Sequence, residues 1–179
     1  IIEYGDRRAK FRVPEALVDE MEKNFIDGFQ EVLIPEAEKF SPCLERLVNT
    51  HSDSHFTLTS MDPFYYKVLS EMFSDNDMVD VKQTSIYEYE FSSEQFDLIL
   101  AVPVFGVRDK AEENGNFICR EYDMIAAENL ALHLRSEGIL AIVLPSIITF
   151  CGSNVRELRH FIQSMYFLKE IADLPAGIF

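Results

Sequence analysis

The chain of 179 residues carries 16 Lys and Arg residues against 31 Asp and Glu residues, a formal net charge of -15, and 47% of its residues are hydrophobic. A chain of this size and composition is expected to form one compact domain with a full core. The acidic charge repels phosphate, so direct DNA binding by this chain is not expected. No apolar run approaches the roughly 18 residues of a membrane span.

Apolar residues at helical or alternating spacing predict a series of helices and strands. In chain order these are a helix over 13–25, a strand over 31–34, a helix within 36–49, a strand over 55–61, a helix over 64–73, strands over 78–86 and 96–102, a helix over 119–138, a strand over 139–145, a helix over 154–166 and a last strand over 167–175. Gly138 is expected to end the long helix, because glycine is common just past a helix end. The apolar run over 139–145 is typical of a strand that is buried on both faces of a parallel sheet.

Strands and helices alternate through most of the chain, which predicts an α/β domain with a mainly parallel sheet. In such sheets ligands bind at the carboxyl ends of the strands, near the point where the strand order reverses. We therefore expect a functional site at the strand ends that follow Ile34, Met61, Thr84 and Ala101.

Six stretches of the chain, taken in order, resemble the adenine-specific DNA methylases that form the modification subunits of type I restriction systems. They are FRVP (11–14), VLIPEAEKFSPCLERL (32–47), TLTSMDPFYYKVL (57–69), FDLILAVPVFG (96–106), EGILAIVLP (137–145) and FLKEIADLPAGIF (167–179). The resemblance implies one domain over 1–179 with a Rossmann-like fold of the S-adenosylmethionine-dependent methyltransferases. It implies a helical lead-in over 1–30 and an α/β core over 31–179, with the closing antiparallel hairpin of that fold lying beyond Phe179.

The chain departs from the family in the loop that would bind the methyl donor. In the family this loop reads D-P-A-C-G-T-G, and its glycines let the backbone approach S-adenosylmethionine. Here the loop starts at Ile34 and Pro35 and contains no glycine. Glu36 and Glu38 are expected to place negative charge, and Phe40 to place bulk, where the resemblance implies the methionine end of the donor.

Two further donor contacts of the family are altered. The resemblance implies an acid after the second strand, which would bind the ribose hydroxyls, and another after the third strand, which would contact the donor's adenine. Ser60 stands at the first of these positions, with Asp62 two residues on, and Thr84 stands at the second. Neither position offers the expected carboxylate.

The family's catalytic N-P-P-F tetrapeptide corresponds here to Val102, Pro103, Val104 and Phe105. In the family, the Asn side chain and a proline carbonyl accept hydrogen bonds from the amino group of the target adenine. The side chain of Val102 can accept none. Only Phe105 is retained as a residue that could stack on a flipped base.

Four altered sites together predict a domain that keeps the methyltransferase fold without S-adenosylmethionine binding or catalysis. No cofactor is then expected, and the domain would serve as an interaction or scaffold module for a protein partner or for further domains of a larger chain. The alternative is a divergent but active adenine-N6 DNA methyltransferase of a type I restriction-modification system, which would bind S-adenosylmethionine.

The sequence offers little evidence for a metal site. His51, Asp53 and His55 lie close together, but a structural metal site needs about four ligands with supporting contacts. A solvated loop is the better interpretation, and no metal is expected. The three cysteines lack paired spacing, which favours reduced thiols and a cytoplasmic protein.

Overall fold

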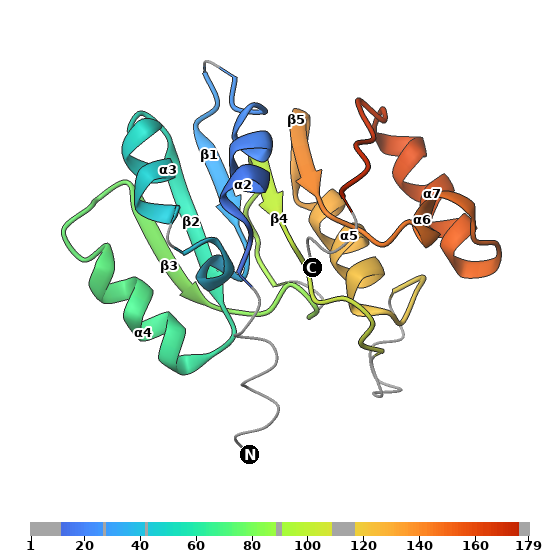
Figure 1. Ribbon diagram of the computed structural model, residues 1–179, viewed down its shortest axis with the longest axis horizontal. Coiled ribbons are helices and arrows are strands. Elements are labelled where there is room, and N and C mark those ends of the chain that lie inside the picture. Colours follow the sequence, from blue (N-terminus) through green and yellow to red (C-terminus); the bar gives the residue numbers. More distant parts are fainter. Residues whose placement is uncertain (1–11, 27, 42, 89–90, 109–116, 176–179) are drawn as a thin grey trace.

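Five parallel strands form the centre of the fold, in the order β3-β2-β1-β4-β5 (Figure 1). The computed structural model describes residues 12–26, 28–41, 43–88, 91–108 and 117–175. The strands are β1 (Glu31–Ile34), β2 (His55–Ser60), β3 (Val79–Gln83), β4 (Phe96–Ala101) and β5 (Leu134–Ile142). The chain runs outward from β1 through β2 to β3 and then crosses to the other side of β1. The strand order therefore reverses between β1 and β4, which is where open α/β sheets bind their ligands.

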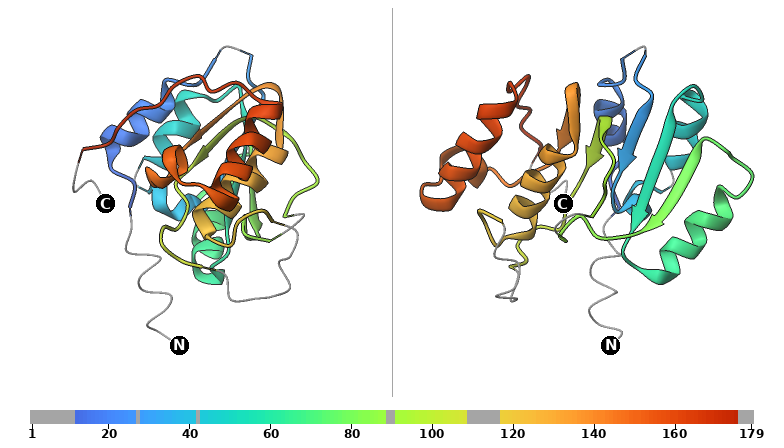
Figure 2. Two further views of the ribbon diagram at one scale, coloured as in Figure 1. Left: turned by 90° about the vertical axis from the view of Figure 1, so that its right-hand side faces the viewer. Right: turned by 180° about the vertical axis from the view of Figure 1, so that it is seen from behind.

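Helices cover both faces of this sheet (Figures 1 and 2). They are α2 (Glu15–Glu22), η1 (Ala37–Phe40), α3 (Leu44–Thr50), α4 (Pro63–Met72), α5 (Tyr122–Leu132), α6 (Ile147–Phe150) and α7 (Ser153–Met165). Val32 and Ile34 point to the core shared with α2, α3 and α4, whereas Leu33 points to the core shared with α5. This alternation follows from the two-residue period of a strand. None of the helices in the described part of the chain has the length and apolarity to cross a bilayer.

The first four strands lie where the sequence predicts them. The helix α2 forms inside its predicted segment, and α3, α4 and α7 each extend one residue beyond theirs. Local chemistry explains the start of α4. The Asp62 carboxylate accepts a hydrogen bond of 2.8 Å from the Phe64 amide, and Pro63 occupies the first turn, where its missing N–H costs nothing.

The prediction for the end of the long helix is wrong. The helix α5 ends at Leu132, and β5 begins at Leu134, so Gly138 lies inside the strand. A Cβ atom at Gly138 would approach the carbonyl oxygens of Arg135 and Asp97 to 3.0 Å. The glycine is therefore needed where β5 passes close to β4, next to an irregularity in their pairing, and not to end a helix.

Two other expectations for the C-terminal part are also wrong. Residues 167–175 form no strand, and the side chains of Phe167, Leu168 and Ile171 are exposed. Apolar content alone does not make a strand when no neighbouring strand pairs with it. The strand β5 pairs only with β4 among the described residues, so residues 139–142 are half-buried at the edge of the sheet and not buried on both faces.

Candidate functional site

The turn after β1 carries a buried ion pair. Glu36 has left-handed backbone angles (φ 49°, ψ 47°) and turns the chain directly from β1 into η1. Its Oε2 atom lies 2.7 Å from Nζ of Lys39 and accepts a hydrogen bond of 2.8 Å from the Tyr87 hydroxyl. All three residues are buried, with 6%, 3% and 4% of their surfaces exposed for Glu36, Lys39 and Tyr87.

The same ion pair is joined to the loop after β4. Lys39 Nζ donates a hydrogen bond of 2.8 Å to the Val102 carbonyl, and the Val104 amide donates one of 2.8 Å to the Tyr87 hydroxyl. We call these five residues the Glu36 network: Glu36, Lys39, Tyr87, Val102 and Val104. It ties together the turn after β1, the connection between β3 and β4, and the loop after β4.

The start of α5 supports this network from the other side. The Tyr122 ring stacks on the Tyr87 ring, with centroids 4.4 Å apart and planes 15° from parallel. The Asp123 carboxylate accepts a hydrogen bond from the Gly106 amide at 3.4 Å and one from the Met124 amide at 2.9 Å. Burial raises the pKa of Asp123, and the backbone hydrogen bonds oppose that rise.

Glu38 and Ser60 meet beside the network. Burial raises the pKa of Glu38 to about 7, and the charge of Glu36 adds to the rise, while hydrogen bonds from the backbone and Ser60 oppose it. Among the described residues, Oε2 of Glu38 has no hydrogen-bond partner. Ser60 is fully buried, and its hydroxyl accepts a hydrogen bond of 3.3 Å from the Asp62 amide.

Two other predicted donor positions, Thr84 and Asp62, use their side chains in local hydrogen bonds. The Thr84 hydroxyl donates to the Phe91 carbonyl at 3.3 Å, within its own connection. Asp62 caps α4 instead of facing Ser60 with its carboxylate. Phe40 is wholly buried, in the same core cluster as Ile34 and Val102 at the ends of β1 and β4.

The loop at the catalytic tetrapeptide position is bonded through the Val102 carbonyl and the Val104 amide to the side chains of Lys39 and Tyr87. Val102 and Pro103 are buried, and Val104 and Phe105 are half-buried. Phe105 packs against the core that contains α2 and α3. The structure thus brings Glu36, Val102 and Val104 together, as the strand-end rule predicts.

Lys39 and Tyr87, which complete the network, were not among the site residues predicted from the sequence. The spacing of Glu36 and Lys39, an acid and a base three residues apart between two apolar stretches, could have suggested a local ion pair. Nothing in the sequence distinguishes Tyr87 from the other tyrosines near it.

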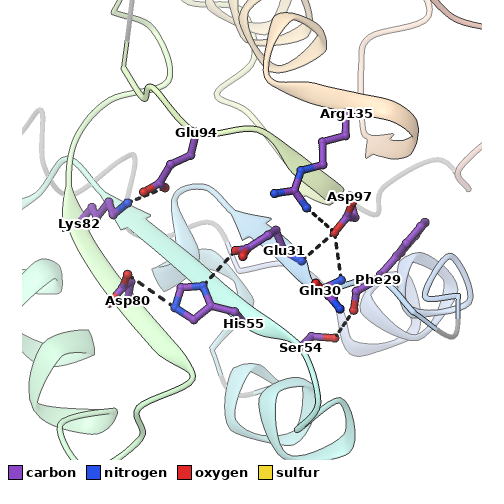
Figure 3. A network of polar contacts seen from close by, with 10 residues as sticks. All are labelled: Phe29, Gln30, Glu31, Ser54, His55, Asp80, Lys82, Glu94, Asp97 and Arg135. Carbon is purple, nitrogen blue, oxygen red and sulfur yellow. Dashed lines mark hydrogen bonds and ion pairs between the residues drawn. The ribbon is translucent and has the colours of Figure 1, made fainter.

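In the part of the chain that the structure describes, no three His, Cys, Asp or Glu side chains are grouped so that they could hold a metal ion. His51 stacks on Phe25 at 3.6 Å and lies 3.1 Å from Glu22. His55 is the first residue of β2 and lies between Glu31, at 3.1 Å, and Asp80, at 3.6 Å (Figure 3). Both rings are therefore held by carboxylates of neighbouring elements.

Two surface hollows lie beside α4, away from the ends of β1 and β4. One, of about 670 Å³, opens between α3 and α4 and is lined by Glu45, Phe64, Lys67, Val68, Glu71 and Met72. The other, of about 320 Å³, lies between α4 and β3. Neither is lined by a residue of the Glu36 network.

The parallel sheet, its strand order and the helices on both faces define a Rossmann-like fold of the S-adenosylmethionine-dependent methyltransferases. No protein-family model matches the chain, and no curated protein matches its sequence. Solved structures do match. The StiE O-MT structure is 14% identical, with a TM-score of 0.53, over 82% of this chain and 48% of that chain.

Two other structures match to a similar degree. A coclaurine N-methyltransferase bound to N-methylheliamine and SAH is 16% identical, with a TM-score of 0.51, over 71% of this chain and 34% of that chain. The [4+2]-cyclase SpnF is 15% identical, with a TM-score of 0.51, over 71% of this chain and 43% of that chain. The chain thus spans less than half the length of these structures, and at this identity the likeness is one of fold.

Proposed function

We propose that the chain is a methyltransferase-fold domain that has lost methyl-donor binding and acts as an interaction module for a protein partner. The observation that carries this proposal is the position of Lys39 Nζ, which is bonded to both the Glu36 carboxylate and the Val102 carbonyl. The resemblance in sequence implies the donor and the target base at these two strand ends. Here the two ends are bonded to each other.

Opening this arrangement for a ligand is energetically costly. Both side chains of the Glu36–Lys39 pair are nearly inaccessible, at 8% and 3% exposed. Separating a buried ion pair leaves uncompensated charge in a medium of low polarity, which costs about 3–5 kcal/mol. A donor would have to supply this energy in addition to its own binding free energy.

The fold does not by itself argue for methyl transfer. The matched structures include methyltransferases and also a protein named as a [4+2]-cyclase, in keeping with the general rule that one fold hosts several functions. A net charge of -15 favours a protein partner over nucleic acid. Three free cysteines suit a reducing compartment, such as the cytoplasm.

The test is a calorimetric titration of the 179-residue chain with S-adenosylmethionine and, separately, with S-adenosylhomocysteine. We expect no heat of binding up to about 1 mM ligand, which corresponds to a binding free energy weaker than about -4 kcal/mol. The coclaurine N-methyltransferase, titrated under the same conditions with S-adenosylhomocysteine, is the positive control. Micromolar binding to this chain would contradict the proposal.

A second candidate function is adenine-N6 methylation of DNA with a rearranged donor site. It is favoured by the six family-like stretches and by matched structures that hold SAH. Incubation of the chain with unmethylated DNA and radiolabelled S-adenosylmethionine distinguishes the two candidates. If the DNA becomes labelled, and Phe105→Ala abolishes the labelling, the chain is a DNA methyltransferase. If the chain is an interaction module that has lost donor binding, no label is expected in the DNA.

A further inference from the structure

The outer side of α4 carries an apolar stripe that the fold does not use. Phe64, Val68 and Met72 follow one another at four-residue spacing and are 66%, 45% and 38% exposed. A different side of the helix already supplies Leu69, which follows Val68 about 100° round the helix axis, to the core. A helix with apolar residues on two sides has one side available for a second contact.

This stripe borders the hollow between α3 and α4. The hollow measures about 670 Å³, and Phe64, Val68 and Met72 line it together with Glu45 of α3. Figure 1 shows α4 on the outside of the fold, beside β3 and far from α7. A groove between two helices matches the shape of a third helix, whose side-chain ridges fit between those of its neighbours.

The charges around the groove indicate the chemistry of its occupant. Two carboxylates, of Glu45 and Glu71, and one ammonium, of Lys67, line it. A second copy of the chain would bring the same carboxylates and a further net charge of -15, so self-association is disfavoured. The backbone of α4 is already bonded within its helix, so the stripe offers no edge to which an extended strand could pair.

We propose that the groove between α3 and α4 binds a basic amphipathic helix of a protein partner. The partner's apolar residues, at three- and four-residue spacing, pack on Phe64, Val68 and Met72, and its lysines or arginines face Glu45 and Glu71. A helix of about 10 residues, or 15 Å, is enough to cover the stripe. The inference rests on the proposed function, since it names the surface through which the domain acts.

The probe is a synthetic 18-residue peptide of leucine and lysine with leucine at alternating three- and four-residue spacing. It is titrated into the ¹⁵N-labelled 179-residue chain and followed by amide chemical shifts. We expect saturable binding, with the largest shifts in residues 44–50 and 61–73. A peptide of the same composition in scrambled order, and one with glutamate in place of lysine, are expected to bind at least about tenfold more weakly.

Matched variants distinguish binding at the groove from non-specific electrostatic or hydrophobic binding of the peptide. Phe64→Ser and Phe150→Ser remove equally exposed rings, 66% and 69% exposed, from α4 and α6. Glu71→Lys and Glu157→Lys change the net charge equally at two exposed helical sites. We expect the α4 variants to weaken peptide binding about tenfold and the other two to change it less than twofold. Equal losses within each pair, or shifts outside α3 and α4, would overturn the proposal.

The same samples distinguish this inference from the proposed function. If neither the peptide nor the donor binds, the groove is not the interaction surface, and the proposal that donor binding is lost still stands. Donor binding together with peptide binding at α4 would contradict the proposal that donor binding is lost, and it would support the groove as an interaction surface. Light scattering measures the oligomeric state of the parent chain and of Phe64→Ser. If the parent chain forms concentration-dependent dimers and the variant stays monomeric, a second copy occupies the groove, and the proposal of a basic partner is overturned.

Discussion

The two ends of the sheet hold ion pairs of similar geometry in different surroundings. At the carboxyl ends, Glu36 and Lys39 lie 2.7 Å apart with side chains 8% and 3% exposed. At the amino ends, Asp97 and Arg135 lie 3.0 Å apart with side chains 20% and 41% exposed (Figure 3). An ion pair that water screens contributes little to stability. In a buried pair, removal of one partner leaves the other charge without compensation and destabilises the fold strongly. The end of the sheet where ligands bind in this fold is thus the end that tolerates change least.

The amino-end pair is also supported by the backbone. The Asp97 carboxylate accepts hydrogen bonds of 3.0 and 2.9 Å from the amides of Gln30 and Glu31, in addition to Arg135 (Figure 3). Burial acts to raise the pKa of Asp97, but these hydrogen bonds outweigh it and lower the pKa. The stability that Asp97 contributes is therefore present at neutral pH and lost as the pH falls through its lowered pKa.

The largest expected effect comes from breaking the buried pair. Lys39→Met leaves the Glu36 carboxylate buried without its cation and with the hydrogen bond from the Tyr87 hydroxyl. We predict a loss of about 3–5 kcal/mol in the free energy of unfolding. Urea denaturation followed by circular dichroism measures it. The double variant Glu36→Gln/Lys39→Met should regain most of this loss. A loss below about 1 kcal/mol in the single variant would show that water screens the pair.

The next effect is a gain in stability at alkaline pH. The pKa of Glu38 is raised to about 7 from an ordinary value of 4.5. The native state therefore holds this proton more tightly than the unfolded state, and the free energy of unfolding falls as the pH rises from 4.5 to about 7. At 1.36 kcal/mol per pKa unit, the rise from 4.5 to about 7 corresponds to about 3 kcal/mol, so Glu38→Gln should be about 3 kcal/mol more stable than the parent chain at pH 8. Urea denaturation at pH 4.5, 6 and 8 tests this, with the exposed Glu45→Gln as control. Parallel stability profiles for parent and Glu38→Gln would contradict it.

A smaller loss is expected from removing the bridging hydroxyl. Tyr87→Phe takes away the donor to the buried Glu36 carboxylate and the acceptor for the half-buried Val104 amide. The loss should cost about 1–3 kcal/mol, because both groups are left without this partner. Tyr166→Phe is the matched control, since among the described residues its hydroxyl bonds only to the Leu134 carbonyl. The comparison fails if both variants lose the same stability in denaturant.

The smallest effect should come from the amino end. Arg135→Met removes the exposed partner of Asp97, whose carboxylate keeps its two backbone hydrogen bonds. We predict a loss of about 0.5–1 kcal/mol that decreases further in high salt. Thermal unfolding of the parent chain and the variant at low and at high ionic strength measures this loss of stability and its dependence on salt. A salt-independent loss as large as that of Lys39→Met would remove the distinction between the two ends.

The sequence predicted the parts of the fold that depend on side-chain period. Alternating or continuous apolar residues located β1 to β4, and the strand-end rule brought Glu36 close to Val102. It could not predict that Lys39 would turn inward to the Val102 carbonyl, because that depends on the left-handed turn at Glu36. Gly138 misled the prediction because glycine serves both helix ends and close strand contacts, and only the position of β4 decides between them.

The stack of Tyr87 on Tyr122 makes the buried network optically visible. The chain has 7 tyrosines and no tryptophan, so its near-ultraviolet spectrum comes mainly from phenol rings. Two such rings 4.4 Å apart and 15° from parallel are close enough for their electronic transitions to couple. Near-ultraviolet circular dichroism should therefore carry a signal from this pair, which reports on the environment of the Glu36 carboxylate without any label.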